Sequence, residues 1–95
     1  MSRLKTRMVY KYEIRTETIE FHVRMPINAE IIFVDRQRKA PCMWVLADKT
    51  YTLTQEREFY ILGTGWDIPS DAVYVGTWQE PEYGLVWHLF EKVTP

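Results

Sequence analysis

Apolar and polar residues alternate along two stretches near the start of the chain. In 8–15 every second residue is apolar, and the same period returns in 19–25 after a polar break at 16–18. A period of two places neighbouring side chains on opposite faces of an extended strand. The two stretches therefore predict two strands, which we expect to pair as one hairpin.

Short apolar runs separated by turn-forming residues predict five further strands. The run within 30–35 is continuously apolar and rich in β-branched side chains, which is typical of a strand buried on both faces. We expect it to pair with a second apolar run at 42–47, across a charged connection at 36–41. The other strands are expected at 57–62, 72–79 and 85–91, with irregular segments at 48–55, 63–71 and 80–84. Seven short strands without a helical period predict an all-β fold, either a small antiparallel β-sandwich or a partly open barrel of about seven strands.

Length and composition fit one small folded unit. The 95 residues contain no linker or repeat, so we expect a single domain over 1–95, with 1–7 as a flexible N-terminal segment. Hydrophobic residues make up 46% of the chain and charged residues 26%, which places it outside the composition of disordered proteins. Aromatic residues make up 15%, and we expect some of these rings to remain outside the core as adhesive surface.

Charge is balanced overall but unevenly distributed. The net charge of −1 gives no general attraction to nucleic acid or to an anionic membrane. Residues 1–39 contain nine Lys and Arg and five acidic residues, a net charge of +4, whereas 40–95 contain three and eight, a net charge of −5. The basic residues around Tyr10 and Tyr12 resemble a nucleic-acid surface, but both tyrosines fall on the apolar face and are expected in the core. Nucleic acid is therefore not an expected partner.

Cysteine use and hydropathy indicate a compartment. Cys42 is the only cysteine, so no disulfide forms within the chain, as is typical of a reducing compartment. No apolar run approaches the roughly 18 residues of a membrane span, and the first residues lack the apolar stretch of a signal peptide. We expect a cytoplasmic protein without membrane contact.

The residue types that carry catalysis and metal binding are sparse. The chain has two histidines, His22 and His88, and no set of nucleophile, base and orienting group at a known spacing. A Cys42–His88 thiol–imidazole pair is an alternative, although Cys42 is explained more simply as a small buried hydrophobic residue. These three residues lack the paired spacing of a zinc site. We therefore expect no catalytic residues, no metal, no cofactor and no enzyme activity.

Carboxylates offer weaker alternatives. Glu56 with Glu58, and Glu80 with Glu82, have the spacing of acid–base pairs flanking a groove, but charges on strand edges also prevent chain-to-chain pairing. The acidic loop that follows Gly65 imitates a calcium loop only loosely. We expect these acids to be solvated surface residues.

A glycine-rich loop before a tryptophan is the strongest candidate binding element. Gly63-Thr64-Gly65 lacks the lysine and the following helix of a phosphate-binding loop, so two glycines at a sharp turn explain it more simply. Trp66 follows this loop directly, and we expect its large indole either to pack against the protein surface or to contact a ligand. A site for a small ligand or nucleotide would combine this loop with three polar residues and the indole: Gly63, Thr64, Gly65, Trp66, Arg57, Thr77 and His88. A protein interface would instead use Trp66, Trp78 and Tyr83 as anchors.

Several motifs in order resemble those of one family. They are Val9-Tyr10-Lys11-Tyr12, Met25-Pro26 with Ala29-Glu30-Ile31, Pro41-Cys42-Met43-Trp44, Phe59 with Gly63-Thr64-Gly65, Tyr74 to Gln79, and Val86 to Glu91. Over Val9 to Glu91 the chain resembles a family of small proteins of unknown function encoded largely by bacteriophages and prophages. The resemblance implies a setting of host interaction but no activity, cofactor or site.

Three functions fit these observations. The first is a non-enzymatic accessory protein that binds a host or phage protein, as an inhibitor or in an anti-defence role. The second is a protein that sequesters a small ligand or nucleotide. The third is a virion or assembly protein, which would form homo-oligomers through exposed sheet edges.

Overall fold

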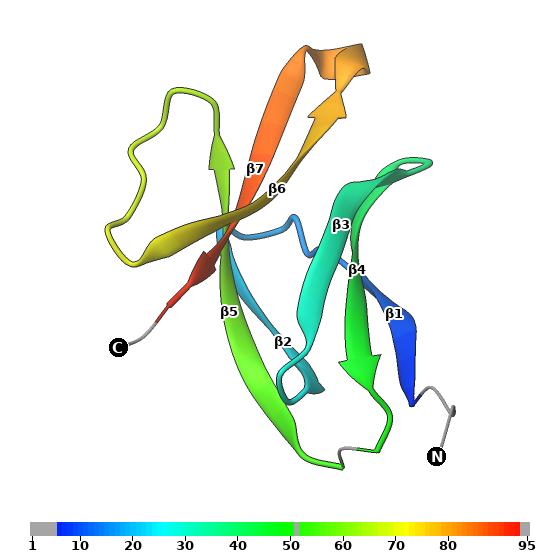
Figure 1. Cartoon of the computed structure of the whole chain (residues 1–95). Coiled ribbons are helices and arrows are strands. Elements are labelled where there is room, and N and C mark those ends of the chain that lie inside the picture. Colours follow the sequence, from blue (N-terminus) through cyan, green and yellow to red (C-terminus); the bar gives the residue numbers. More distant parts are fainter. Residues whose placement is uncertain (1–5, 51, 94–95) are drawn as a thin grey trace.

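Seven strands and one short 3-10 helix make up the fold. The computed structural model describes residues 6–50 and 52–93 (Figure 1). Its elements are β1 (Arg7–Glu13), β2 (Glu20–Pro26), β3 (Glu30–Gln37), β4 (Ala40–Asp48), β5 (Thr54–Gly63), β6 (Ala72–Glu80), η1 (Pro81–Tyr83) and β7 (Leu85–Lys92). The expected all-β fold of seven strands is confirmed. The expected N-terminal segment 1–7 lies largely outside the described residues.

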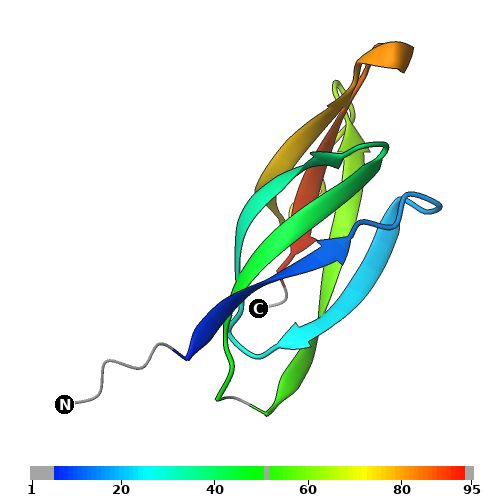
Figure 2. The ribbon, with the colours of Figure 1, turned by 90° about the vertical axis from the view of Figure 1, so that its right-hand side faces the viewer.

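The strands form two antiparallel sheets. Sheet A has three strands in the order β1-β4-β3, and sheet B has four in the order β2-β5-β7-β6. The sheets lie face to face and do not close into a barrel, so the fold is a sandwich (Figure 2). Within the described part of the chain, no helix has the length and apolar character needed to cross a membrane.

The expected hairpin of the first two strands is wrong. β1 pairs with β4 in sheet A, and β2 pairs with β5 in sheet B. Between them residues 14–19, which we call the crossover segment, carry the chain from one sheet to the other. Ile14 is 2% exposed, and its backbone N–H donates to Pro41 O at 2.9 Å. This buried side chain and the polar residues after it lead the chain across the edge of the sandwich instead of into a tight turn.

The pairing of β3 with β4 is confirmed, but the surroundings of β3 differ from expectation. The connection is short, because β3 extends to Gln37, β4 begins at Ala40, and Arg38 adopts a φ of 61° in the turn. β3 is buried on one face only: Ile32 and Phe33 are 47% and 56% exposed beside a register shift. No described element packs on the outer face of sheet A, so a continuous apolar run does not imply two buried faces here.

The inner faces of the two sheets form one core. Met43 and Val45 of sheet A and Phe59 and Leu89 of sheet B are at most 1% exposed. The expectation that Tyr10 and Tyr12 turn inward is confirmed, since both pack against this core. Cys42 is also buried, at 3% exposure, although it is not part of this core cluster. Burial raises the pKa of its thiol.

β3 and β6, the outer strands on one side of the sandwich, approach each other closely at Gly76. A Cβ atom added there would lie 2.6 Å from Val34 Cβ, closer than such atoms come in proteins. The φ of Gly76 is not in the left-handed region, so the glycine is required by space and not by its backbone conformation.

An ion pair also connects the two sheets on the β3–β6 side, towards the end of the sandwich at which η1 lies. Both terminal nitrogens of Arg36 in β3 donate to the Glu82 carboxylate in η1 at 2.8 Å, and Arg36 Nη1 also donates to Gln79 O. The Arg36 side chain is 14% exposed and that of Glu82 is 40% exposed. The hydrogen bonds from Arg36 lower the pKa of Glu82 to about 2.

The topology mixes the basic N-terminal half of the chain with the acidic C-terminal half, so their charged side chains lie close together. The basic N-terminal half contributes β2 to sheet B, where Arg24 lies 3.7 Å from Glu56 of β5. Arg36 of β3 also meets an acid of the C-terminal half, Glu82 in η1. Opposite charges from the two halves therefore meet in pairs, within sheet B and between the two sheets.

Replacing Gly76 with alanine tests the close approach of β3 and β6. The added methyl group must displace Val34 or push the strands apart, and overpacking of this kind costs about 1–3 kcal/mol of unfolding free energy. Urea denaturation followed by far-UV circular dichroism should show a lower midpoint for Gly76→Ala. A variant as stable as the parent would mean that the two strands separate freely.

Replacing Glu82 with glutamine tests the Arg36 contact through pH. Folding lowers the pKa of Glu82 from 4.5 to about 2, so the ionised carboxylate stabilises the fold above about pH 4.5. This stabilisation is lost as the pH falls through about 2. Thermal denaturation should therefore show a lower Tm for Glu82→Gln at neutral pH, and the difference should shrink towards pH 2. Glu30→Gln is the control, because Glu30 is exposed and forms no ion pair with the described residues. An equal pH profile for the two variants would contradict the assignment.

Candidate functional site

Three adjacent strands place aromatic side chains in one row on the inner face of sheet B. Gly63 of β5 is opposite Trp87 of β7, and Trp87 is opposite Trp78 of β6. Directly opposed residues in antiparallel strands project from the same face. The row therefore consists of a glycine and two tryptophans, and the glycine leaves room for a third ring.

Trp66 occupies the room above Gly63. Its backbone N–H donates to Gly63 O at 3.2 Å, which closes a tight turn at the end of β5. A Cβ atom on Gly63 would lie 2.8 Å from Trp66 Cε2, so the indole rests directly on the glycine backbone. The Trp66 and Trp87 rings are 5.7 Å apart between centroids with their planes at 84°. The expectation of a sharp turn at this loop is confirmed. The turn places the Trp66 indole against Gly63 at the end of the core.

A cleft of about 320 Å³ opens beside these rings, and we call it the tryptophan cleft. One wall comes from sheet B and its loop, and the other comes from the crossover segment. The lining residues are Ile61, Trp66, Trp78, Glu80 and Trp87 on the sheet side, and Thr16, Glu17, Thr18 and Ile19 on the crossover side. The β6–β7 hairpin extends beyond the β3–β4 hairpin, so sheet A does not cover this end of sheet B (Figures 1 and 2). The volume is at the lower end of the range of ligand-binding pockets.

The polar side-chain groups of the cleft are two carboxylates, two threonine hydroxyls and the N–H groups of three indoles. Trp87 Nε1 donates to Glu80 Oε1 at 3.0 Å. Glu17, on the crossover side, adds a second carboxylate, and no Lys or Arg is among the described lining residues. Trp78 is 2% exposed, and its buried Nε1 has no acceptor among the described residues. The cleft is therefore aromatic and negatively charged.

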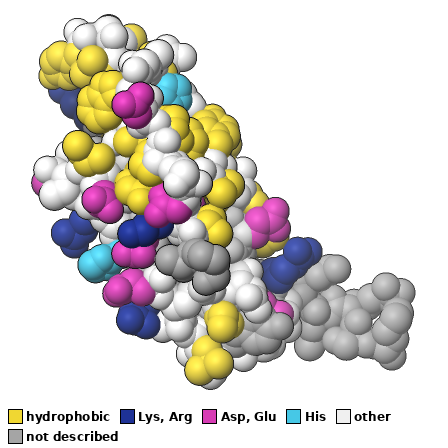
Figure 3. Space-filling view, turned by 90° about the vertical axis from the view of Figure 1, so that its left-hand side faces the viewer, with side chains coloured by type: hydrophobic (Ala, Val, Ile, Leu, Met, Phe, Trp, Pro, Cys, Tyr) yellow, Lys and Arg dark blue, Asp and Glu magenta, His cyan; other side chains and the backbone are white. Residues whose placement is uncertain are grey.

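Exposed apolar side chains lie at the same end of sheet B as the cleft, on the Trp66 loop and around the β6–β7 turn. Trp66 is 46% exposed, Leu85 41%, Val86 36% and Tyr83 74%. A second hollow lies on the other side of Trp66 and is lined by Leu85, Val86 and both rings of the Trp66–Trp87 pair. Hydrophobic side chains are gathered in the upper part of the molecule in Figure 3, while charged side chains dominate lower down. We call the cleft and these exposed residues the tryptophan end.

His88 lies on the opposite face of sheet B between two hydroxyl groups. Its Nε2 is 2.8 Å from Thr64 Oγ1 and its Nδ1 is 3.0 Å from Thr77 Oγ1, which is in turn 2.7 Å from Tyr74 Oη. A catalytic imidazole is normally oriented by a carboxylate that stabilises its charged form. A hydroxyl occupies that position here, and the network ties the loop after β5 to β6 and β7.

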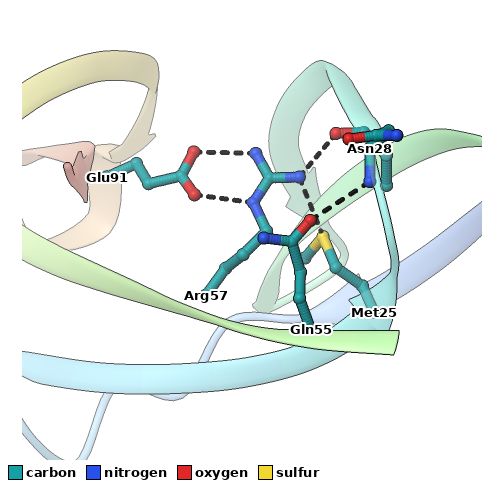
Figure 4. A network of polar contacts seen from close by, with 6 residues as sticks. Met25, Asn28, Gln55, Arg57 and Glu91 are labelled. Atoms are coloured by element: carbon teal, nitrogen blue, oxygen red, sulfur yellow. Dashed lines mark hydrogen bonds and ion pairs between the residues drawn. The ribbon is translucent and has the colours of Figure 1, made fainter. Parts of the chain in front are cut away.

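Arg57 is engaged in a different network (Figure 4). Its guanidinium donates two hydrogen bonds to the Glu91 carboxylate, at 2.6 and 2.8 Å, and further bonds to Ala29 O and Met25 Sδ. The Arg57 and Glu91 side chains are only 16% and 20% exposed. Removing one partner from such a pair costs about 3–5 kcal/mol when the pair is buried. Arg57 therefore holds the β2–β3 turn against sheet B.

The structure brings together some of the sequence-predicted site residues and separates others. Gly63, Gly65 and Trp66 form the turn above the cleft. Thr64, Thr77 and His88 meet on the outer face of sheet B, and Arg57 is six positions from Gly63 along β5. Tyr83 is the most exposed of the three expected anchors. Trp78 has almost no surface left for a partner, because it is packed under the cleft.

Sequence reasoning missed three features of the cleft: Trp87, Ile61 and the crossover segment. Glu80 was expected only as part of a Glu80–Glu82 pair flanking a groove, and it lines the cleft without Glu82. The expected turn at 80–84 is centred on residue 82, and counting outward from this centre pairs Trp78 with Val86, one residue short of the observed partner Trp87. The contribution of 16–19 was hidden because these residues were taken as part of a hairpin.

The structure separates the members of two alternative chemical sites. Cys42 alternates with the core residue Met43 and His88 with the core residue Leu89, so the thiol and the imidazole face away from each other on different sheets. Glu80 bonds Trp87, whereas Glu82 bonds Arg36. Among the described residues, no three His, Cys, Asp or Glu side chains are grouped as metal ligands.

Replacing Gly63 with alanine tests the position of Trp66. The new Cβ would overlap the indole, which must leave its place above β5. In ¹H–¹⁵N spectra the Trp66 and Trp87 indole resonances should shift, while that of Trp44, on the outer face of sheet A, should not. Gly76→Ala is a matched control that crowds Val34 instead, and it should leave the Trp66 resonance in place. Unchanged Trp66 and Trp87 resonances in Gly63→Ala would refute this arrangement.

Comparison with known proteins identifies a family. No curated protein and no solved structure matches the chain significantly. Residues 5–95 match the family described as "Domain of unknown function (DUF7352)". The match agrees with the resemblance to an uncharacterised family and carries no information on a phage origin. Since the match spans nearly the whole chain, this protein belongs to the DUF7352 family.

Proposed function

We propose that this protein is a non-catalytic binding protein that captures a protein partner with the tryptophan end. The observation that carries the proposal is the convergence of Trp66, Trp78 and Trp87 at the one end of the sandwich where sheet A stops short. A small β-sandwich gains most from rings that are buried. Here two large rings are instead left exposed: Trp66, which lines the cleft, at 46%, and Tyr83, in the turn between β6 and β7, at 74%.

The shape and charge of this surface favour a protein partner that inserts a side chain, and they argue against a nucleotide. A concave centre with aromatic and aliphatic residues around it is typical of an interface in which one group is inserted and its surroundings exclude water. A phosphate group would face Glu17 and Glu80 with no cationic side chain in the described lining to balance it. The nucleotide alternative thus has less support from the cleft than a protein partner.

The biological setting of the proposal comes from the sequence. The resemblance to phage and prophage proteins supports a role in binding a host protein, as an inhibitor or in an anti-defence function. The single cysteine, Cys42, is a free and buried thiol, which supports the reducing environment of the cytoplasm.

Affinity capture with matched variants tests the binding surface. The tagged protein is used as bait in extracts of cells that naturally express it, and retained proteins are quantified against two variants. Tyr83→Ala removes an exposed ring of the tryptophan end, and Phe33→Ala removes an exposed ring from the outer face of sheet A. Truncating a central interface residue costs about 2 kcal/mol or more, so a specific partner should be lost with Tyr83→Ala and kept with Phe33→Ala.

The opposite pattern would place the interface on sheet A and contradict the proposal. Equal retention by all three baits would show that neither ring belongs to an interface. Circular dichroism of each variant must first show that its strands remain folded.

A further inference from the structure

We infer that the tryptophan cleft binds a cationic side chain, lysine or arginine, of the partner protein. The inference rests on the proposed function, because the side chain must be presented by a bound protein. Its basis is the combination of aromatic walls, two carboxylates and short hydrocarbon surfaces in one cleft.

The aromatic walls suit a cation. Trp66 and Trp87 both line the cleft and stand at 84° to each other, with the edge of one ring against the face of the other. The faces of these rings are electron-rich and attract ammonium and guanidinium groups, with tryptophan the strongest of the aromatic side chains. Trp78 beneath them is held in place by burial and does not have to be ordered on binding.

The charges of the cleft point the same way. Glu80 accepts one hydrogen bond from Trp87 through Oε1, and no described donor is bonded to its Oε2. Glu17 on the crossover segment is the second carboxylate, and the described lining residues include no Lys or Arg. Arg36 lies outside the lining, where its hydrogen bonds to Glu82 and, to a smaller extent, the charge of Glu80 raise its pKa. Within the described lining a bound cation would meet two carboxylates, whereas a bound anion would meet no cationic side chain.

The remaining lining residues fit the stem of a long cationic side chain. Ile19 and Ile61 provide aliphatic surface on either side of the cleft. Lysine and arginine bury their methylene groups against such surface while the charged end remains beside polar groups. A small inorganic cation would leave this apolar surface unused.

Titration with short peptides tests the inference. The probes are acetylated, amidated tripeptides with a central arginine or lysine, and their neutral isosteres contain citrulline or acetyl-lysine. Arginine or lysine peptides should shift the Trp66 and Trp87 indole resonances and leave that of Trp44 unchanged. The isosteres should bind at least about tenfold more weakly, and added salt should weaken the binding of the cationic peptides.

Matched charge variants locate the effect. Glu80→Gln keeps an acceptor for Trp87 Nε1 but removes the charge, and it should weaken peptide binding about fivefold, the effect of one half-exposed charge contact. Glu58→Gln removes the same charge from the outer face of sheet B and should have no effect. Equal binding of isosteres and charged peptides, or no shift with any peptide, would overturn the inference. Tighter binding of choline than of either peptide would overturn a protein side chain as the occupant.

Capture with the Glu80→Gln bait separates this inference from the proposed function. Loss of the partner with both Tyr83→Ala and Glu80→Gln supports both. Loss with Tyr83→Ala alone overturns the cationic side chain and leaves the binding surface standing. Retention with both variants overturns both.

Discussion

The structure depends on burying large rings between two sheets of unequal size. Sheet B has four strands and sheet A three, so the two inner faces cannot cover each other completely. Where the sheets do meet, β3 and β6 approach each other closely because Gly76 has no side chain to separate them. At the end beyond the β3–β4 hairpin, Trp66 and the crossover segment take the place of a strand. The cleft is thus a result of how the core is closed.

Two ion pairs strengthen the sandwich towards opposite ends. Arg36 connects β3 of sheet A to Glu82 beyond β6, near the cleft. Arg57 connects β5 and β7 of sheet B to the turn before β3. A chain of 95 residues buries a smaller share of its surface than a larger domain, so each such contact is a substantial part of its stability. Charges that are distant in sequence thereby stabilise the packing of the sheets.

Much of the fold was predictable because its information is local. The period of two at β1 and β2 and the turn residues around β6 and β7 indicated the strands and their number. The partner of β1 was not predictable, since alternation shows which side chains share a face and not which strand lies alongside. The cleft was predictable only in part: Gly63 and Trp66 are three positions apart in sequence, whereas Glu17 joins them through the crossover segment. A site assembled from one sheet and a distant connecting segment requires the topology first.

The crossover segment has a further consequence for how this family can diversify. Thr16, Glu17 and Thr18 line the cleft, yet all three are exposed and none belongs to the core. Substitutions at these positions change one wall of the cleft at little cost in folding free energy. Relatives with the same scaffold are thereby free to acquire different binding preferences, much as hypervariable loops do on other β-sandwiches.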